Sequence, residues 1–252
     1  MLLHEHLENG ADKNPNFPFS EFEGNSLSYQ EANLLSNQLA NKLVSEGLEV
    51  GDRFAFLAKN CTEMAIMYYA ASKVGAVPVP LNYRLADQEW AYIINDSEAK
   101  LIIVKGNEYS DRINQISSEL KNVKKYISIS LDTSIEKFQD FYDWLSDSSN
   151  EKPTLKIHEN DDVYQMYTSG TTGHPKGAVL LQRNVAANIR QYLNSLTLPR
   201  PSRTLLVAPM YHAAAMINMC GCIAIGGTIV IQEDFIPQDV VDCLANEKIT
   251  HT

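Results

Sequence analysis

The chain has 252 residues, of which 44% are hydrophobic, so it is long enough to bury a substantial core in one or two domains. Its formal net charge is -10 at pH 7 and it has no run of lysines or arginines, which argues against binding a nucleic-acid backbone or an anionic membrane. Cys61, Cys220, Cys222 and Cys243 are spaced too irregularly for a disulfide framework, and no second pair of metal ligands accompanies Cys220 and Cys222. We therefore expect reduced, mostly buried thiols.

The first predicted helix begins after Ser28. Ser28 and Glu31 form a capping-box pattern, and apolar residues then recur at helical spacing up to Gly47, which is typical of a C-terminal cap. The chain starts with MLLHEHLENG, which has histidines and acidic residues where a secretory signal peptide has a basic start and an apolar run. We therefore expect a cytoplasmic protein.

The next part of the chain alternates short apolar strands with helices. The predicted elements, in order, are a strand at 53–58, a helix at 62–74, a strand at 76–79 closed by Pro80, a helix near 88–95, a strand at 101–104, a helix near 110–121 and a strand at 126–130. Strands separated by helices favour an α/β fold with a mainly parallel sheet that is covered on both faces.

A polar stretch, residues 132–162, is interpreted as a surface connection that leads to a buried strand at 163–167. After the loop that follows this strand, we predict a helix at 184–196, a strand at 204–208 and a helix at 237–246.

The uncharged stretch at 213–231 is nearly 20 residues long, which meets the length criterion for a membrane-spanning helix. Gly226 and Gly227 divide it into a helix and a β-branched strand, and no basic flank marks a cytoplasmic side, so we interpret it as core. An apolar strand starts at the last four residues, 249–252, which leads us to expect that the chain is truncated.

The most informative segment is the sequence TSGTTGHPKG at 168–177, directly after a buried strand. Its four hydroxyl side chains can donate hydrogen bonds to phosphate oxygens, its three glycines let backbone N–H groups approach closely, and Lys176 adds a positive charge. A glycine-rich hairpin turn with solvated hydroxyls is the alternative. A simple turn does not need ten residues of this kind, so we interpret the segment as a polyphosphate-binding loop.

This loop differs from the common nucleoside triphosphatase loop, in which two glycines separated by four residues precede Lys-Ser or Lys-Thr. In this chain Pro175 stands where the second glycine would follow Gly170, and Gly177 follows Lys176 where a magnesium-binding hydroxyl would be expected. The loop therefore belongs to a different class.

The run YTSGTTGHPKGAVL at 167–180 resembles the signature of the adenylate-forming superfamily, which includes acyl-CoA synthetases, peptide-synthetase adenylation domains and firefly-type luciferases. Three further stretches agree in the same order: LSY at 27–29, KVGAVPVPLN at 73–82 and PMYH at 209–212. The chain is most similar to the amino-terminal part of acyl-CoA synthetases of the fatty-acid–CoA ligase type.

The resemblance implies a two-step reaction that uses ATP, Mg²⁺ and coenzyme A. A carboxylate attacks the α-phosphate of ATP to give acyl-AMP and pyrophosphate, and a thiol then takes the acyl group. Carried over to this sequence, the residues that would hold the β- and γ-phosphates are Thr168, Ser169, Gly170, Thr171, Thr172, Gly173 and Lys176. Such preorganised donors would stabilise the charge that gathers on the leaving pyrophosphate.

His212 is the candidate catalytic residue, because in similar enzymes this histidine lies beside the acyl carboxylate and the α-phosphate. A lone histidine is more often structural, but the Pro-x-x-His context favours the site. Many relatives have glycine three positions after the histidine, whereas this chain has Ala215, which would narrow or reshape the acyl tunnel.

Two other groups of residues have simpler interpretations. Asn82, Tyr83 and Arg84 are expected to form a turn with a solvated arginine, although similar stretches follow a strand in acyl-CoA synthetases. Trp90 and Tyr92 are expected to pack a helix against the core and not to form a substrate platform.

The preferred function is an acyl-CoA ligase for a fatty or other carboxylic acid, because VPLNYRL at 79–85 resembles acyl-CoA synthetases more than peptide-synthetase modules. An adenylation unit that loads a carrier protein is an alternative. A non-catalytic nucleotide-binding or structural fragment is another. The segments that contact adenine, magnesium and ribose in similar enzymes, and the late lysine that promotes adenylation, come further along the chain, so we expect this piece alone to be inactive.

The resemblance implies an incomplete large domain with two packed, mainly parallel sheets flanked by helices in αβαβα layers. Residues 51–200 would form most of the first subdomain, and residues 1–50 with 201–252 would begin the second. An unfinished sheet exposes strand edge and apolar surface, so we expect homo-oligomers as well as small-molecule partners.

Overall fold

A computed structural model of the chain describes residues 1–130, 135–168 and 173–252. Its helices are α1 (Leu3–Lys13), α2 (Tyr29–Ser45), α3 (Thr62–Val74), α4 (Asp87–Asp96), α5 (Asn107–Ile116), α6 (Phe141–Leu145), α7 (Gln182–Ser195), α8 (Ala213–Ala224) and α9 (Pro237–Asn246), with a short 3₁₀ helix at Ser117–Glu119. Its strands are β1 (Pro18–Phe22), β2 (Asn25–Ser28), β3 (Arg53–Leu57), β4 (Val77–Pro80), β5 (Leu101–Lys105), β6 (Lys125–Ile129), β7 (Phe138–Asp140), β8 (Asp162–Thr168), β9 (Lys176–Leu181), β10 (Arg203–Leu206) and β11 (Thr228–Ile231).

The larger sheet has five strands in the order β4-β3-β5-β6-β7, and all neighbours in it are parallel. Side chains alternate between the two faces of a strand, so Phe54 and Phe56 of β3 enter one core cluster while Ala55 and Leu57 enter another. Both faces are thus buried, which explains why β3 and β5 read as continuous apolar runs. The predicted α/β fold with a parallel sheet covered on both sides is confirmed.

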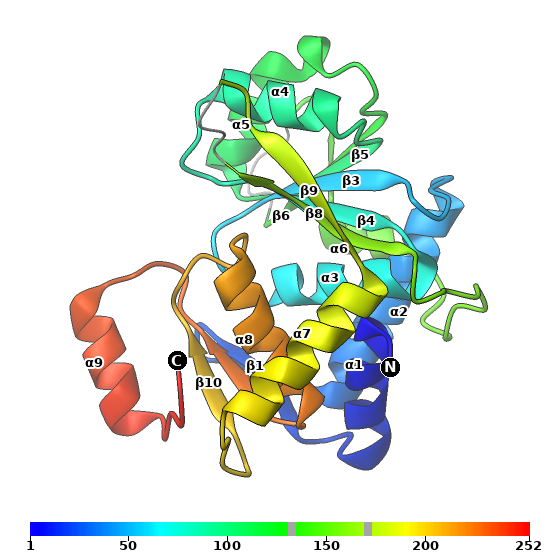
Figure 1. Cartoon of the computed structure of the whole chain (residues 1–252). Coiled ribbons are helices and arrows are strands. Elements are labelled where there is room, and N and C mark those ends of the chain that lie inside the picture. The colour runs from blue at the N-terminus through cyan, green and yellow to red at the C-terminus, as the bar shows by residue number, and fades with distance from the viewer. Residues whose placement is uncertain (131–134, 169–172) are drawn as a thin grey trace.

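The second sheet has four strands in the order β10-β11-β1-β2, in which β10, β11 and β1 are parallel and β2 is antiparallel to β1. Figure 1 shows it in the lower half, with the five-stranded sheet in the upper half and α3 and α8 between them. α3 contacts strands of both sheets. The sheet joins strands of the first 28 residues to strands after residue 202. The division into subdomains remains an interpretation.

β8 and β9 form a separate antiparallel hairpin that packs against β4. The strand predicted at 163–167 is therefore present and buried at Val163, Tyr164 and Met166, but it joins neither parallel sheet. Its pairing with β9 places the two ends of the predicted phosphate loop side by side (Figure 1).

The predicted capping box begins α2. The Ser28 N–H donates to Glu31 Oε2 at 2.8 Å, and the Glu31 N–H donates to Ser28 Oγ at 3.3 Å. α2 ends at Ser45, and Gly47 follows with a φ of 85°, which a glycine adopts without strain. The local sequence therefore sets both ends of this helix.

The interpretation of residues 132–162 as a surface connection holds for residues 146–161, which are mostly exposed and form no helix or strand, but it is wrong for residues 138–145. β7 adds a parallel strand beside β6, and α6 buries Phe141, Trp144 and Leu145. Both elements are too short to show a period along the sequence, so composition alone hid them.

Three side chains of α2 hold the chain that follows α6, and we call them the α2 clamp. Asn37 Nδ2 donates to the Asn150 carbonyl at 3.0 Å, and Gln38 Nε2 donates to the Leu145 carbonyl at 2.8 Å. Asn41 Nδ2 donates to the carbonyls of Ser149 and Glu151, both at 2.8 Å. These bonds give partners to backbone carbonyls in a segment that belongs to no helix or sheet.

The uncharged stretch at 213–231 forms α8 and β11, which Gly226 and Gly227 separate as predicted. None of the helices in the described residues is both long and apolar enough to cross a membrane. All four cysteines are free and buried, as expected. At the last residues the Thr250 N–H donates to the Arg203 carbonyl at 2.9 Å, so the predicted strand start lies beside β10.

Two amino-terminal elements were not predicted, namely α1 and the β1–β2 hairpin. α1 has few apolar residues, and only one stripe of it, which includes Leu3 and Leu7, is buried. The signal in the sequence is therefore weak, and packing against α2, α3, α7 and α8 supplies the stability.

Candidate functional site

The β8–β9 hairpin carries the ends of the predicted phosphate loop. Thr168 ends β8, Lys176 begins β9, and the two face each other in the hairpin register with exposed side chains. Gly173 has a φ of 123°, a conformation that side chains other than glycine rarely adopt. The other predicted ligands, Ser169, Gly170, Thr171 and Thr172, lie outside the described residues.

Gly177 has a different role from the glycines of the loop. A Cβ atom at this position would lie 2.3 Å from Gln165 Nε2 and 2.9 Å from the Tyr167 ring across the hairpin. The Gln165 carboxamide can move away by giving up hydrogen bonds such as the one from Arg53 Nε at 3.3 Å, whereas the Tyr167 ring is less mobile because its Oη donates to Asp96 at 2.6 Å. Packing against Tyr167 therefore favours glycine as the last residue of TSGTTGHPKG.

His212 lies at the junction between β10 and α8, where it is the N-terminal cap residue of α8 with an extended backbone. Its N–H donates to the Pro209 carbonyl at 2.9 Å, and its carbonyl accepts from the Met216 N–H at 3.1 Å. The imidazole is exposed next to the first turn of α8, whose free N–H groups favour a negatively charged neighbour.

The surroundings of His212 favour the neutral form of its imidazole. Burial, and then the positive charge of Arg84, hold the pKa of the His212 imidazole below its usual value. Tyr211 packs between His212 and the turn that carries Tyr83 and Arg84, since its ring lies 4.3 Å from the His212 ring and 5.5 Å from the Tyr83 ring. At neutral pH His212 therefore has one ring nitrogen that donates and one that accepts.

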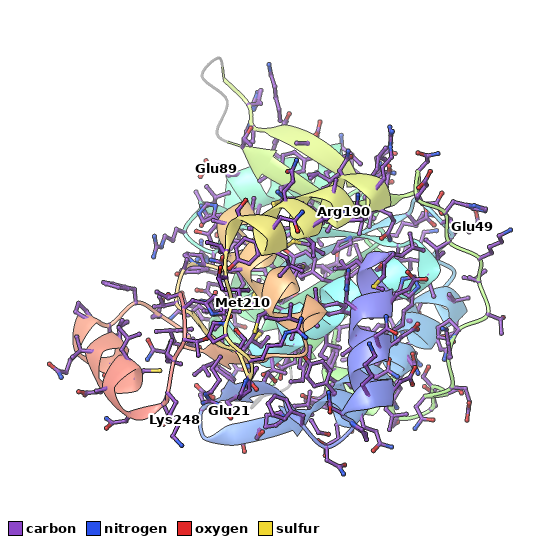
Figure 2. All side chains as sticks on the ribbon, turned by 60° about the horizontal axis from the view of Figure 1, so that its bottom comes forward. Glu21, Glu49, Glu89, Arg190, Met210 and Lys248 are labelled. Carbon is purple, nitrogen blue, oxygen red and sulfur yellow. The ribbon has the colours of Figure 1, made fainter. Side chains whose placement is uncertain are left out.

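A pocket of about 320 Å³ connects the hairpin to His212. The lining residues are Tyr167, Thr168 and Pro175 from the hairpin, Tyr211 and His212 from the β10–α8 junction, and Pro80, Asn82, Leu85, Glu89 and Ile93 from β4, α4 and the turn between them. In Figure 2 the labelled Glu89 lies near the end of the hairpin, and Met210 lies in the interior beside α8. Segments that are far apart in the sequence thus converge on one cavity.

Of the predicted site residues that the structure describes, Thr168 and His212 line this pocket, while Gly173 and Lys176 do not. A larger cavity of about 510 Å³ lies between the β1–β2 hairpin and α9, and it contains none of the predicted site residues. The roles of all these residues remain predictions.

The predicted turn at Asn82, Tyr83 and Arg84 is confirmed, because the Leu85 N–H donates to the Asn82 carbonyl at 3.2 Å and Arg84 is exposed. The turn also borders the pocket through Asn82. Sequence reasoning had missed this proximity to His212, which only the convergence of the two sheets creates.

The predicted packing role is confirmed for Trp90 and for Tyr92, which is partly buried against the same core cluster. Trp90 is fully buried, and its Nε1–H donates to the Asn82 carbonyl at 2.8 Å. Tyr92 also stacks on His174, with ring centroids 4.6 Å apart and planes 18° from parallel, a contact that the sequence did not predict.

A second unpredicted group lies at the ends of β3 and β11. Lys59 Nζ lies 2.6 Å from Asp234 Oδ2, and Tyr83 Oη donates to Asp234 Oδ1 at 3.3 Å. The hydrogen bond to Asp234 raises the pKa of Lys59. These contacts connect the two sheets beside the pocket.

Comparisons with known proteins show which proteins this chain resembles. The sequence profile described as "AMP-binding enzyme" matches residues 7–252. The long-chain-fatty-acid–CoA ligase FadD13 of Mycobacterium tuberculosis is 30% identical over 225 residues, which covers 88% of this chain and 43% of that protein. The feruloyl-CoA synthase of an Amycolatopsis species is 30% identical over 228 residues, covering 90% of this chain and 43% of that protein.

The inhibitor-bound crystal structure of the N-terminal domain of FACL13 from Mycobacterium tuberculosis is 27% identical and superposes with a TM-score of 0.88, covering 98% of this chain and 61% of that chain. The chain therefore spans less than half the length of these two curated relatives.

Proposed function

The chain belongs to the family of AMP-binding enzymes, and on that premise we propose that the protein joins a carboxylic acid to coenzyme A at the expense of ATP. The observation that carries this proposal is the pocket of about 320 Å³ in which Thr168 of the hairpin and His212 of the β10–α8 junction meet. An anion-binding loop, a neutral histidine and a helix N-terminus around one cavity suit a reaction between a carboxylate and a polyphosphate.

In the first step the acid's carboxylate oxygen attacks the α-phosphorus, and the bond to the pyrophosphate oxygen breaks. Lys176 and the N–H and hydroxyl groups of the loop would hold the β- and γ-phosphates and stabilise the charge on the departing pyrophosphate. His212 would donate a hydrogen bond to an oxygen of the carboxylate or the α-phosphate, since its neutral ring keeps one N–H. In the second step the thiol displaces AMP from the acyl group.

Mg²⁺ is part of this proposal as a partner of the nucleotide. Across the described ranges no group of three or more acidic, histidine or cysteine side chains could hold a metal ion. Mg²⁺ is commonly bound by one or two carboxylates together with substrate phosphates. The phosphates would therefore supply most of its ligands.

We propose coenzyme A as the thiol because the two curated relatives named above are called CoA ligase and CoA synthase. Their names specify different acids, a long-chain fatty acid and ferulate, so the acid is proposed only as a fatty or aryl carboxylic acid. Transfer to a carrier protein is the second candidate, which a direct test with each thiol would distinguish.

The test is ATP–pyrophosphate exchange by the full-length protein with panels of fatty and aryl acids, followed by thioester formation with coenzyme A or a carrier protein. Lys176→Ala should reduce exchange by roughly 100-fold, as expected for loss of a charge-stabilising group. Lys156→Ala is the matched control, because Lys156 is also exposed but lies outside the predicted phosphate loop. Unchanged turnover in Lys176→Ala, or no binding of magnesium nucleotide by calorimetry, would refute the proposal.

We also propose that residues 1–252 do not turn over substrate by themselves. The support is that the curated relatives named above are more than twice as long as the matched segment. Efficient acyl-CoA formation by this chain alone would contradict the proposal.

A further inference from the structure

Asn60 makes three hydrogen bonds that connect the two sheets. It follows β3 of the five-stranded sheet, and only 2% of its surface is exposed. Its Nδ2 donates to the carbonyls of Ala208 and Gln232, both at 3.1 Å, and its Oδ1 accepts from the Met210 N–H at 2.7 Å. The carboxamide thus uses both donor hydrogens and its oxygen on backbone groups only.

These partners belong to the two segments that leave β10 and β11 of the four-stranded sheet. Met210 is two residues before His212, and the segment between them is short and turns sharply, since the His212 N–H bonds back to Pro209. Tyr68 Oη adds a weaker bond to the Met210 carbonyl at 3.4 Å. The position of His212 relative to the hairpin is therefore fixed from the end of β3, through a side chain that does not line the pocket.

We propose that Asn60 is a positioning residue for His212, holding the β10–α8 junction against the five-stranded sheet so that the imidazole faces the pocket. The expected fall in kcat rests on the proposed function, whereas the expected change in the position of the His212 imidazole does not depend on any activity. A displacement of about 1 Å at a reacting group lowers turnover by roughly 100-fold, so loss of these bonds should reduce kcat more than it changes substrate affinity.

Three variants separate positioning from general stability. Asn60→Ala removes all three bonds, whereas Asn60→Asp keeps the shape and the bond from Met210 but loses both donated bonds. Asn37→Ala is the matched control, because Asn37 is also a buried asparagine, with 4% exposure, that donates to a backbone carbonyl. It belongs to the α2 clamp and has no contact with the β10–α8 junction.

The first measurement is the imidazole resonance of His212 by NMR, assigned with His212→Gln and followed from pH 5 to 8. In both Asn60 variants we expect the resonance to shift and its titration to move toward that of an ordinary histidine, because the ring leaves its place beside Tyr211 and Arg84. Asn37→Ala should leave the resonance unchanged. A His212 resonance and titration that stay at their original values in folded Asn60→Asp would overturn the proposal.

The second measurement is ATP–pyrophosphate exchange by the full-length variants, each assayed below its own melting temperature. We expect kcat to fall roughly 10- to 100-fold in the Asn60 variants, with KM for ATP within about twofold, and no change in Asn37→Ala. Wild-type kcat in folded Asn60→Asp would likewise overturn the proposal. If the unchanged protein shows no exchange with any acid, the proposed function fails, and the NMR result alone decides the role of Asn60.

Discussion

Replacing Gly177 with alanine tests whether the packing of the β8–β9 hairpin requires a residue without a side chain at this position. The new methyl group would lie 2.3 Å from Gln165 Nε2 and within 3.1 Å of two atoms of the Tyr167 ring. Such distances force a shift, and overpacking of a well-filled site costs about 1–3 kcal/mol. If Gln165 moves, its bond to Tyr167 Oη at 3.0 Å is also lost, which adds about 1 kcal/mol. We therefore expect Gly177→Ala to destabilise the chain by about 2–4 kcal/mol.

Urea denaturation of four proteins in a double-mutant cycle measures this effect. Gln165→Ala removes the atom at 2.3 Å, so Gly177→Ala should cost less in that background than in the original chain. The residual cost reflects the Tyr167 ring. Calorimetric titration with magnesium ATP should show weaker binding in Gly177→Ala, because Thr168 and Lys176 lie at the end of the distorted hairpin. A destabilisation below about 0.5 kcal/mol, or additive effects of the two substitutions, would refute the reasoning.

Three further predictions concern other parts of the fold. Burial, and then the charge of the amino terminus, lower the pKa of His6 from 6.5 to about 4, so its contribution to stability is present above pH 6.5 and lost as the pH falls to about 4. As the pH falls over this range, the free energy of unfolding measured in urea should decrease on the order of 2–3 kcal/mol less in His6→Gln than in the original chain. Parallel pH profiles of the two proteins would contradict this. Trp144→Ala should cost about 3–5 kcal/mol by the same assay, because Trp144 is 1% exposed, and a loss below about 1 kcal/mol would show that α6 is dispensable. Tyr92→Leu should remove the ring-current shift of the His174 resonances in NMR and cost about 0.5–1.5 kcal/mol, whereas unchanged resonances would exclude the stack in solution.

The parts of the fold that were predicted correctly depend on neighbours in the sequence. The capping box of α2 joins residues three apart, and β3, α3 and β4 follow one another with little between them. The boundary between α8 and β11 was also predictable, because two glycines divide the apolar stretch at that point. The loop at 168–177 was found because its hydroxyl groups, glycines and lysine are contiguous.

The parts that were missed depend on contacts between distant segments. The carboxamide of Asn60 bonds to residues 148 and 172 positions away, so no local pattern marks it. Tyr92 contacts His174 across 82 positions, a pairing that only the packing of α4 against the hairpin creates. The pocket shows the same limit. Its lining residues come from three separate stretches, and the sequence identified Thr168 and His212 through a resemblance, without indicating the cavity that they share.

The α2 clamp has a consequence for how sequence information is distributed along this chain. Its four bonds end on carbonyl oxygens, which every amino acid has, so these bonds hold residues 145–151 whatever their side chains, whereas the Lys42–Asp147 ion pair and the bond from Ser148 Oγ to the Gln38 carbonyl depend on residue identity. Ser149 and Asn150 can therefore be exchanged for other polar residues with little effect, whereas Asn37 and Asn41 cannot. The path of this irregular segment thus depends on side chains more than one hundred residues upstream, and α2 does not need those side chains to form a helix.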